Sequence, residues 1–257
     1  MSKHKILWQS STVIGGLPDY EKAIYEHAKK ILSPDFELTV RGVSKGTSQI
    51  HFLAFDFLNN AQLFKTVEQA AKEGYEAVAI GCFLDPILDE LREVMDIPIL
   101  GLGEAAMLAA CMFGKRFSVV TYVPENNAKR FPELINKYRL SERAAPSTHF
   151  SISNAEMRSG FANPGPVVDG FKKAAIEAIR QGAEVIIPGC GLLNLILRIG
   201  GISQVENATV LDVSGTLMKM AEMMVTLKNV SGVNVSRVGY YRSPSKELYD
   251  EVRKIYA

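Results

Sequence analysis

Two cysteines occupy matching positions in a sequence that repeats itself. The segment EGYEAVAIGC, which starts at Glu73, recurs as QGAEVIIPGC from Gln181, so Cys82 and Cys190 each follow a glycine at the end of an apolar run. An internal repeat of this kind indicates two structurally equivalent halves. Because ligands bind beyond the carboxyl ends of strands in open parallel sheets, the repeat predicts that both thiols face one cleft.

A pair of thiols on opposite sides of a substrate suits the inversion of a stereocentre. One thiolate removes a proton from one face of the carbon and the other thiol delivers a proton to the opposite face, without metal or pyridoxal phosphate. The helix N-termini expected after both cysteines would favour a thiolate. The alternative interpretation is two small buried apolar side chains, and Cys111, in the run Ala-Ala-Cys-Met-Phe, is interpreted in that way.

The residues around the two thiols complete the expected site. A glycine before each cysteine lets the backbone approach a ligand closely. Hydroxyl groups end the first predicted strand of each half, where they either hold polar ring atoms of a ligand or are ordinary strand-end residues. An aromatic ring beside Cys82 either stacks on a planar ligand or packs inward. The expected substrate-binding residues are Ser10, Gly81, Phe83, Thr121, Tyr122, Gly189 and Gly191.

Apolar runs rich in Val and Ile alternate with amphipathic stretches, a pattern typical of parallel sheets built from βαβ units. In the first half, strands are predicted near Lys5–Ser10, Glu37–Val43, Ala77–Gly81 and Ile97–Gly101, with helices near Asp19–Leu32, Asn59–Glu73, Asp85–Met95 and Glu104–Phe113. In the second half, strands are predicted near Arg116–Thr121, Thr148–Ser151, Glu184–Pro188 and Ala208–Asp212, with helices near Glu125–Lys137, Val167–Gln181, Leu192–Ile199 and Ser214–Leu227.

A second pair of matched segments supports the duplication, since IPILGLGEAAM from Ile97 is similar to ATVLDVSGTLM from Ala208. We therefore predict an α/β fold with two pseudo-symmetric lobes, each a parallel sheet flanked by helices, and an active site in the cleft between them. Lobe 1 is expected to comprise residues 1–101 plus 213–257, and lobe 2 residues 102–212. The helix after Cys82 is expected to begin with Asp85 as its N-cap and Pro86 in its first turn.

Composition narrows the class of protein. A chain of 257 residues that is 47% apolar can bury a substantial core, and a net charge of +1 gives no basis for a nucleic-acid partner. No apolar segment is long enough to span a bilayer, and the N-terminal apolar run is too short for a signal peptide. The odd and low number of three cysteines argues against disulfides and favours a cytoplasmic setting. The four histidines lack paired ligand spacing, so no metal is expected.

Two longer segments, GCFLDPILDELREVMDIPILGLGEAA from Gly81 and PGCGLLNLI from Pro188, carry a family resemblance. They resemble the aspartate/glutamate/hydantoin racemase superfamily, most closely its hydantoin racemase branch, and the likeness covers most of the chain. That branch shows a Cys-Phe-x-Asp-Pro run, an Arg-Glu pair, a proline followed by Gly-x-x-Glu-Ala, and a second Gly-Cys. Here these are Cys82, Phe83, Asp85, Pro86, Arg92, Glu93, Pro98, Gly101, Glu104, Ala105, Gly189, Cys190 and Gly191.

The resemblance implies two flavodoxin-like lobes, a two-base cysteine mechanism, assembly into a homo-oligomer, and substrates such as 5-substituted hydantoins or allantoin. Aspartate and glutamate racemases carry a threonine just after each cysteine to bind the substrate carboxylates. Phe83-Leu84 and Gly191-Leu192 stand at those places here, so an amino-diacid substrate is not expected. Trp8-Gln9-Ser10-Ser11 stands where hydantoin racemases tend to show an Asn-Pro-Asn-Thr-like run.

We therefore expect a cofactor-independent racemase that uses Cys82 and Cys190 as an acid/base pair on a cyclic ureide. Its partner is expected to be a small-molecule substrate, with no nucleic acid and no membrane. The enzymatic alternative is a relative that uses a single cysteine, similar to a maleate isomerase or an arylmalonate decarboxylase. The non-enzymatic alternative is a regulator that binds a small molecule.

Overall fold

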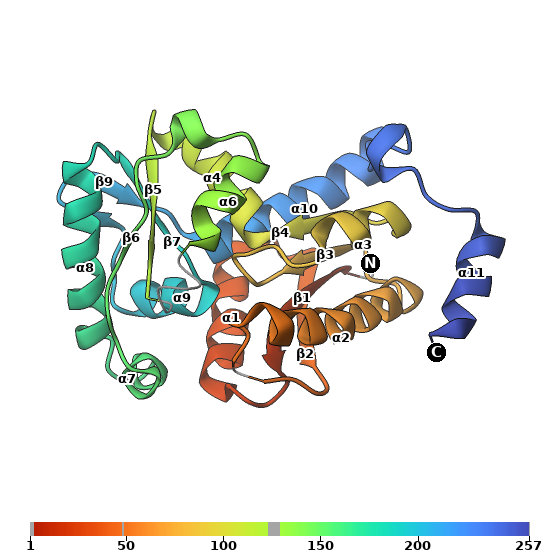
Figure 1. Ribbon diagram of the computed structural model, residues 1–257, viewed down its shortest axis with the longest axis horizontal. Coiled ribbons are helices and arrows are strands. Elements are labelled where there is room, and N and C mark those ends of the chain that lie inside the picture. The colour runs from red at the N-terminus through yellow and green to blue at the C-terminus, as the bar shows by residue number, and fades with distance from the viewer. Residues whose placement is uncertain (1–2, 48, 123–128, 257) are drawn as a thin grey trace.

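The computed structural model describes residues 3–47, 49–122 and 129–256, and it contains two parallel sheets that lie beside one another (Figure 1). The first sheet has the strand order β2-β1-β3-β4, with every neighbouring pair parallel. Its strands are β1 (His4–Val13), β2 (Phe36–Val43), β3 (Ala77–Ile80) and β4 (Ile99–Gly101).

The second sheet has the strand order β6-β5-β7-β9-β8. Its pairs are parallel except for the edge strand β8, which is antiparallel to β9. The strands are β5 (Phe117–Thr121), β6 (Thr148–His149), β7 (Val185–Pro188), β8 (Gln204–Val205) and β9 (Ala208–Val210). The first sheet thus lies within residues 1–101 and the second within 102–212, and the predicted two-lobed α/β fold is confirmed.

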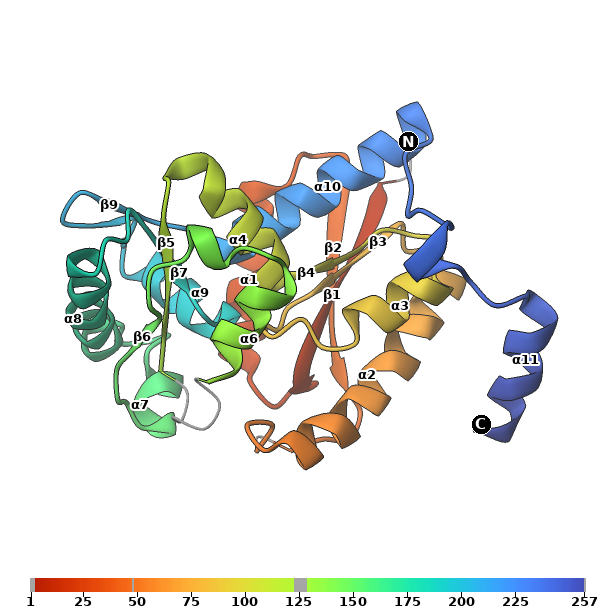
Figure 2. The ribbon, with the colours of Figure 1, turned by 45° about the horizontal axis from the view of Figure 1, so that its top comes forward.

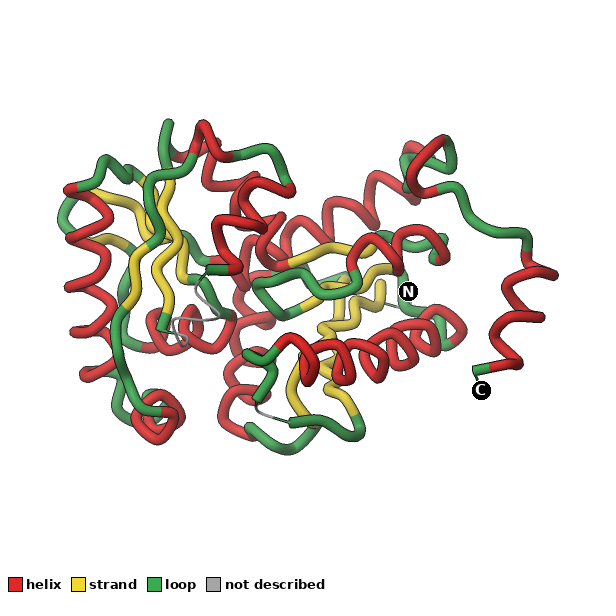
Figure 3. Tube along the Cα trace, viewed as in Figure 1, coloured by secondary structure: helices red, strands yellow, loops and turns green. Residues whose placement is uncertain are grey.

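Helices cover both faces of the two sheets (Figure 3). They are α1 (Pro18–Ile31), α2 (Leu53–Lys72), α3 (Leu88–Val94), α4 (Leu102–Phe113), α6 (Arg130–Lys137), α7 (Asn154–Ser159), α8 (Gly165–Arg180), α9 (Gly191–Ile199), α10 (Val213–Ser231) and α11 (Lys246–Ile255). α2 begins six residues before the predicted Asn59, and the start of the helix predicted at Glu125–Lys137 lies outside the described residues. Among the residues that the structure describes, no helix has the length and apolar character needed to span a bilayer.

The two lobes share one hydrophobic core. Successive strand side chains point to opposite faces of a sheet, so Trp8 enters the shared core while its neighbour Leu7 packs in a second cluster belonging to lobe 1. In the same way Val119 of β5 joins the shared core and Val120 joins a third cluster, which belongs to lobe 2. The lobes are therefore joined by packed side chains and not only by the chain.

Two helices, α4 and α10, build much of the shared core between the sheets (Figure 2). α4 packs against α10 and against strands of both sheets, namely β4, β5 and β7. α10 packs against α1, β3 and β4 of lobe 1 and against α9 of lobe 2. It contributes the buried side chains Val213, Leu217, Met218, Ala221 and Val225.

The C-terminal helix α11 was not predicted, and it stands apart from the body of the protein (Figure 1). Ser245 caps it by accepting a hydrogen bond from the Leu248 N–H. Arg253 forms an ion pair with Glu68 of α2 at 2.8 Å, and the Tyr249 hydroxyl donates to the same carboxylate. Polar contacts therefore tie this helix to lobe 1.

Candidate active site

Both repeat-related cysteines line a single cavity of about 920 Å³ that receives residues from both lobes. Cys82 follows β3 of lobe 1 and Cys190 follows β7 of lobe 2. Of the residues expected to bind substrate, the structure places these on the cavity wall: Ser10, Gly81, Phe83, Tyr122, Gly189 and Gly191. Thr121 lies elsewhere, buried at the end of β5 beside Gly189, and it is not among the residues that line the cavity.

Equivalent hydrogen bonds hold the two Gly-Cys segments. The Gly81 N–H donates to the Gln9 carbonyl at 2.8 Å, and the Gly189 N–H donates to the Val120 carbonyl at 2.8 Å. Each bond extends the ladder from the cysteine-bearing strand to the first strand of its own sheet. A Cβ at Gly81 would lie 2.4 Å from the buried Trp8 Nε1, so close approach of the indole requires glycine there.

The helices that follow the two cysteines begin at different distances from them. Cys190 is the N-cap residue of α9, which begins one residue before the predicted Leu192, and its carbonyl accepts from the Asn194 N–H. Cys82 precedes α3 by six residues, and its carbonyl accepts from the Asp85 N–H in a turn, so the predicted helix start with Asp85 as N-cap is wrong. The positive end of a helix therefore faces one side of the cavity at Cys190, while Cys82 lacks this feature.

Burial raises the pKa of the Cys82 thiol to about 12. The Leu84 backbone N–H and the Ser11 side chain oppose the rise, while negative charge on Asp56 and on Cys190 adds to it. Loss of hydration disfavours the charged form of a buried acid, so Cys82 holds its proton at neutral pH.

Phenol groups lie beside the thiols. The Tyr122 hydroxyl is 3.7 Å from Cys190 Sγ, within the range of a hydrogen bond to sulfur. Burial raises the pKa of Tyr122 well above its ordinary value, and Cys190 raises it further. Burial also raises the pKa of Tyr20, a cavity residue that the sequence analysis missed. Both phenols therefore stay neutral and keep a proton to donate.

An ion pair between the lobes lies at the wall of the cavity. Asp56 of α2, which lines the cavity, accepts from Arg130 of α6 at 2.7 Å. Asp56 was not predicted as a site residue, although an acidic residue between Phe55 and Phe57 is an unusual feature. Exposed polar residues of the lining include His149 and Arg158, and its apolar residues include Phe131, Phe150, Ile152, Met157 and Leu192.

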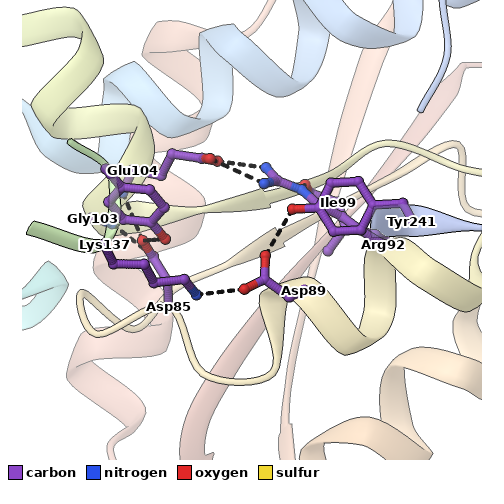
Figure 4. Close-up of polar contacts among 9 residues, drawn as sticks. Asp85, Asp89, Arg92, Ile99, Gly103, Glu104, Lys137 and Tyr241 are labelled. Carbon is purple, nitrogen blue, oxygen red and sulfur yellow. Dashed lines mark hydrogen bonds and ion pairs between the residues drawn. The ribbon is translucent and has the colours of Figure 1, made fainter. Parts of the chain in front are cut away.

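Asp85 holds the turn after Cys82 against α4, where the sequence predicted that it would cap α3 (Figure 4). Its carboxylate accepts from the N–H groups of Gly103 and Glu104, at 2.8 and 2.6 Å, in the first turn of α4. The Tyr138 hydroxyl donates to the same carboxylate at 2.8 Å. That prediction is wrong because the carboxylate is taken up by N–H groups of α4, 18 residues further along the chain, and α3 begins only at Leu88.

Neighbouring ion pairs and a hydrogen bond stabilise the same region (Figure 4). Asp89 of α3 accepts from Lys137 of α6 at 2.8 Å and from the Tyr241 hydroxyl at 2.7 Å. Arg92 of α3 forms a two-pronged pair with Glu104 of α4. The turn after Cys82 and the helix α3 that follows it are therefore together tied to α4, to α6 and to the C-terminal segment.

We expect the stability of the protein to fall as pH rises from about 4 to about 7, through Asp85. Burial raises the pKa of this carboxyl to about 7, against the opposing hydrogen bonds from Gly103, Tyr138 and Glu104. The folded state then binds the proton more tightly than the unfolded state, so unfolding is favoured by raising pH across this window, by a linkage on the order of 4 kcal/mol. Denaturant titrations of wild type and Asp85→Asn between pH 4 and 8 measure it, and the variant should show a flatter profile.

Asp89→Asn is the matched control, because Asp89 lies in the same network with its pKa shifted the other way. Burial opposes that shift, but Lys137 and Tyr241 lower the pKa of Asp89 by hydrogen bonding. Its contribution is therefore present at neutral pH and is lost only as pH falls into the acid range. Parallel wild-type and Asp85→Asn profiles between pH 4 and 7 would contradict the expectation.

No cluster of three or more His, Cys, Asp or Glu side chains suited to a metal ion occurs within residues 3–47, 49–122 and 129–256. The described cavity offers two thiols, two neutral phenols and short hydroxyl side chains, together with the carboxylate of Asp56, the imidazoles of His51 and His149 and the guanidinium of Arg158. This set of groups can remove and deliver protons on opposite sides of a bound molecule.

Two helix-flanked sheets, each with a strand-end thiol on one shared cavity, define a two-lobed α/β protein. The chain belongs to the Asp/Glu/hydantoin racemase family, whose sequence model matches residues 18–221. It is 26% identical over 231 residues to the hydantoin racemase of Paenarthrobacter aurescens, covering 89% of this chain and 93% of that protein. It is 25% identical to the hydantoin racemase of Pseudomonas sp. strain NS671, covering 89% of this chain and 88% of that one.

Among solved structures, the fold is similar to that of allantoin racemase from Klebsiella pneumoniae. The TM-score is 0.79, with 22% sequence identity and 95% of each chain covered. Glutamate racemase RacE1 of Bacillus anthracis matches with a TM-score of 0.64 and 13% identity, covering 100% of this chain and 94% of the other. At these identities the structural likeness establishes the shared fold, and the predicted family membership is confirmed by the sequence match.

Proposed function

We propose that the protein is a cofactor-independent racemase of a cyclic ureide, such as a 5-substituted hydantoin or allantoin, with Cys82 and Cys190 as its acid/base pair. The observation that carries this proposal is that both strand-end thiols line one cavity from opposite lobes. Sequence similarity to two hydantoin racemases supports the substrate class.

In the proposed reaction, the thiolate of one cysteine takes the proton from the carbon that lies between a carbonyl group and a nitrogen. The electron pair of the broken C–H bond moves onto the carbonyl oxygen and forms a planar enolate. The thiol of the other cysteine then delivers its proton to the opposite face of the carbon, and the electron pair returns from the oxygen. Because burial keeps Cys82 protonated, we assign it the proton-donating role at rest and Cys190 the base role.

The lining of the cavity favours a neutral ring over a carboxylate near the thiols. The groups beside Cys190 include the neutral phenols Tyr20 and Tyr122, and the field of Asp56 reaches Cys82, where it opposes a second negative charge. Ser10 and Ser11 supply short hydroxyl groups to the same wall. The cavity of about 920 Å³ leaves room for a substituent on a five-membered ring.

A cytoplasmic location and a homo-oligomeric state form part of the same proposal. All three cysteines are free of disulfides, which fits a reducing compartment. Large apolar side chains are exposed on several helices, which fits contacts between copies of the chain; they include Leu53, Phe57, Leu58, Met112 and Phe113. Sedimentation of the purified protein measures the assembly directly.

The test is proton exchange by the wild-type enzyme in D2O. Single enantiomers of 5-benzylhydantoin, 5-isobutylhydantoin and allantoin are followed by proton NMR and optical rotation, against the spontaneous rate without enzyme. We expect deuterium at the stereocentre together with loss of rotation for at least one ureide. Phenylmalonate and maleate are run alongside, and turnover of either acid with no exchange of any ureide would replace this proposal by a single-cysteine reaction.

A further inference from the structure

Tyr20 reaches the cavity between the two Gly-Cys segments. It lies in the first turn of α1, on the buried face that also carries Ile24 and Ala28, and only 3% of its surface is exposed. Its hydroxyl lies 3.3 Å from the position that a Cβ on Gly191 would take, and the Gly81 carbonyl oxygen lies 3.4 Å from the same position. The hydroxyl of Tyr20, from lobe 1, therefore lies close to the Gly-Cys segments of both lobes.

The environment of Tyr20 keeps its hydroxyl neutral. Burial raises the pKa of the phenol far above its ordinary value, negative charge on Cys190 and on Cys82 adds to the rise, and the Trp8 and Ser10 side chains only partly oppose it. Negative charge on either thiol therefore raises the pKa of the phenol, and its hydroxyl remains an O–H donor whichever thiol is ionised.

We propose that the Tyr20 hydroxyl donates a hydrogen bond to the substrate carbonyl oxygen on which charge develops when the neighbouring carbon loses its proton. This inference rests on the proposed function, since it requires an enolate to form between Cys82 and Cys190. A donor fixed within the buried floor of a cavity stabilises such an oxygen strongly, because it needs no reorientation when the charge appears. Tyr20 is thereby assigned a catalytic role that serves proton removal by either thiol.

Tyr25 has a structural partner outside the cavity, which makes it a suitable control. The Tyr25 hydroxyl, also on α1, accepts from the Val40 N–H at 3.0 Å and lies outside the cavity. Tyr20→Phe and Tyr25→Phe remove the same atom from the same helix. Tyr25→Phe is expected to leave activity unchanged, and thermal unfolding of both variants checks that the fold is retained.

Tyr20→Phe should lower kcat/KM for racemisation by about 100- to 1000-fold, as loss of one oxyanion donor does in other enzymes. The loss should be larger for 5-isobutylhydantoin than for 5-phenylhydantoin, because a phenyl substituent itself delocalises the developing charge. Deuterium exchange should fall to the same extent for both enantiomers, since both pass through one enolate. A residue that only supports the fold would lower the rates for the two hydantoins by the same factor.

The outcomes separate the two proposals. If the wild-type enzyme exchanges no ureide, the proposed function fails and this inference fails with it. If the wild type is active and Tyr20→Phe stays within twofold of it, the Tyr20 role alone is overturned. An equal loss for the two substituents, or a loss of exchange for one enantiomer only, also overturns it, because either result indicates displacement of a neighbouring thiol and not the loss of a shared donor.

Discussion

Cys82→Ser and Cys190→Ser are each expected to reduce racemisation by about 100- to 10,000-fold, while each variant still exchanges one enantiomer of the substrate with solvent. The remaining thiol can remove the proton from its own face of the carbon and return a deuteron to that face, so exchange proceeds with retention. A serine hydroxyl cannot complete inversion, because general acid–base catalysis of about 100- to 10,000-fold is lost with the thiol. The two variants should therefore exchange opposite enantiomers.

These variants also distinguish two bases from one. With wild type in D2O, early product should carry deuterium while unreacted substrate keeps hydrogen, because the acid that delivers the new proton is not the base that removed the old one. Cys111→Ser is the matched control, since Cys111 lies in α4 and does not line the cavity. Exchange of the same enantiomer by both variants, or racemisation within tenfold of wild type in either, would exclude the acid/base pair.

Gly103→Ala is expected to destabilise the protein by about 1–3 kcal/mol, as overpacking of a filled core does, and to displace Cys82 from its working position. A Cβ at Gly103 would lie 2.2 Å from the Phe83 carbonyl oxygen, 2.9 Å from Leu134 Cδ2 and 3.0 Å from Asp85 Oδ2. The closest of these atoms is backbone, directly after Cys82, so the turn that carries the thiol must move. A displacement near 1 Å at a reacting group lowers turnover about 100-fold.

Chemical denaturation and the racemisation rate measure the two effects of Gly103→Ala separately. Gly165→Ala is the control, because Gly165 also lies at the start of a helix and a Cβ there would meet only Asn163 Oδ1, at 3.5 Å. Alanine favours a helix over glycine by about 1 kcal/mol, so the control should be neutral or stabilising. If Gly103→Ala unfolded and turned over like wild type, the close packing of α4 on the turn would not matter for the site.

The positions of the two thiols could be predicted because both cysteines lie at the same place in two copies of a repeated sequence segment. Cys82 and Cys190 stand at equal distances after equivalent glycines, and parallel strands bring equivalent ends to the same edge. Asp85 shows what a local sequence motif does not predict. The Asp-Pro pair is typical of a helix start, but the carboxylate accepts hydrogen bonds from N–H groups of α4. The spacing of residues in the sequence does not predict this contact between distant segments.

Tyr20 could be predicted as buried but not as part of the site. Its spacing with Ile24 and Ala28 indicates the inner face of a helix. Whether that face packs in a core or lines a cavity depends on how lobe 2 packs against lobe 1. The periodicity of one helix carries no information about that packing. Thr121 illustrates the reverse case, because the end of its strand was predicted closely while its side chain lies in the interior.

The placement of α10 has a consequence for biosynthesis. This helix follows lobe 2 in the chain, yet it packs against α1, β3 and β4 of lobe 1 and adds buried side chains such as Leu217 and Met218 to the shared core. A ribosome that has released only residues 1–101 has therefore made a sheet whose apolar face is covered in part by α1 and still lacks α10. Domains otherwise tend to fold in the order in which they emerge. Here the half that is made first is completed last, and the growing chain must shield that face until α10 arrives.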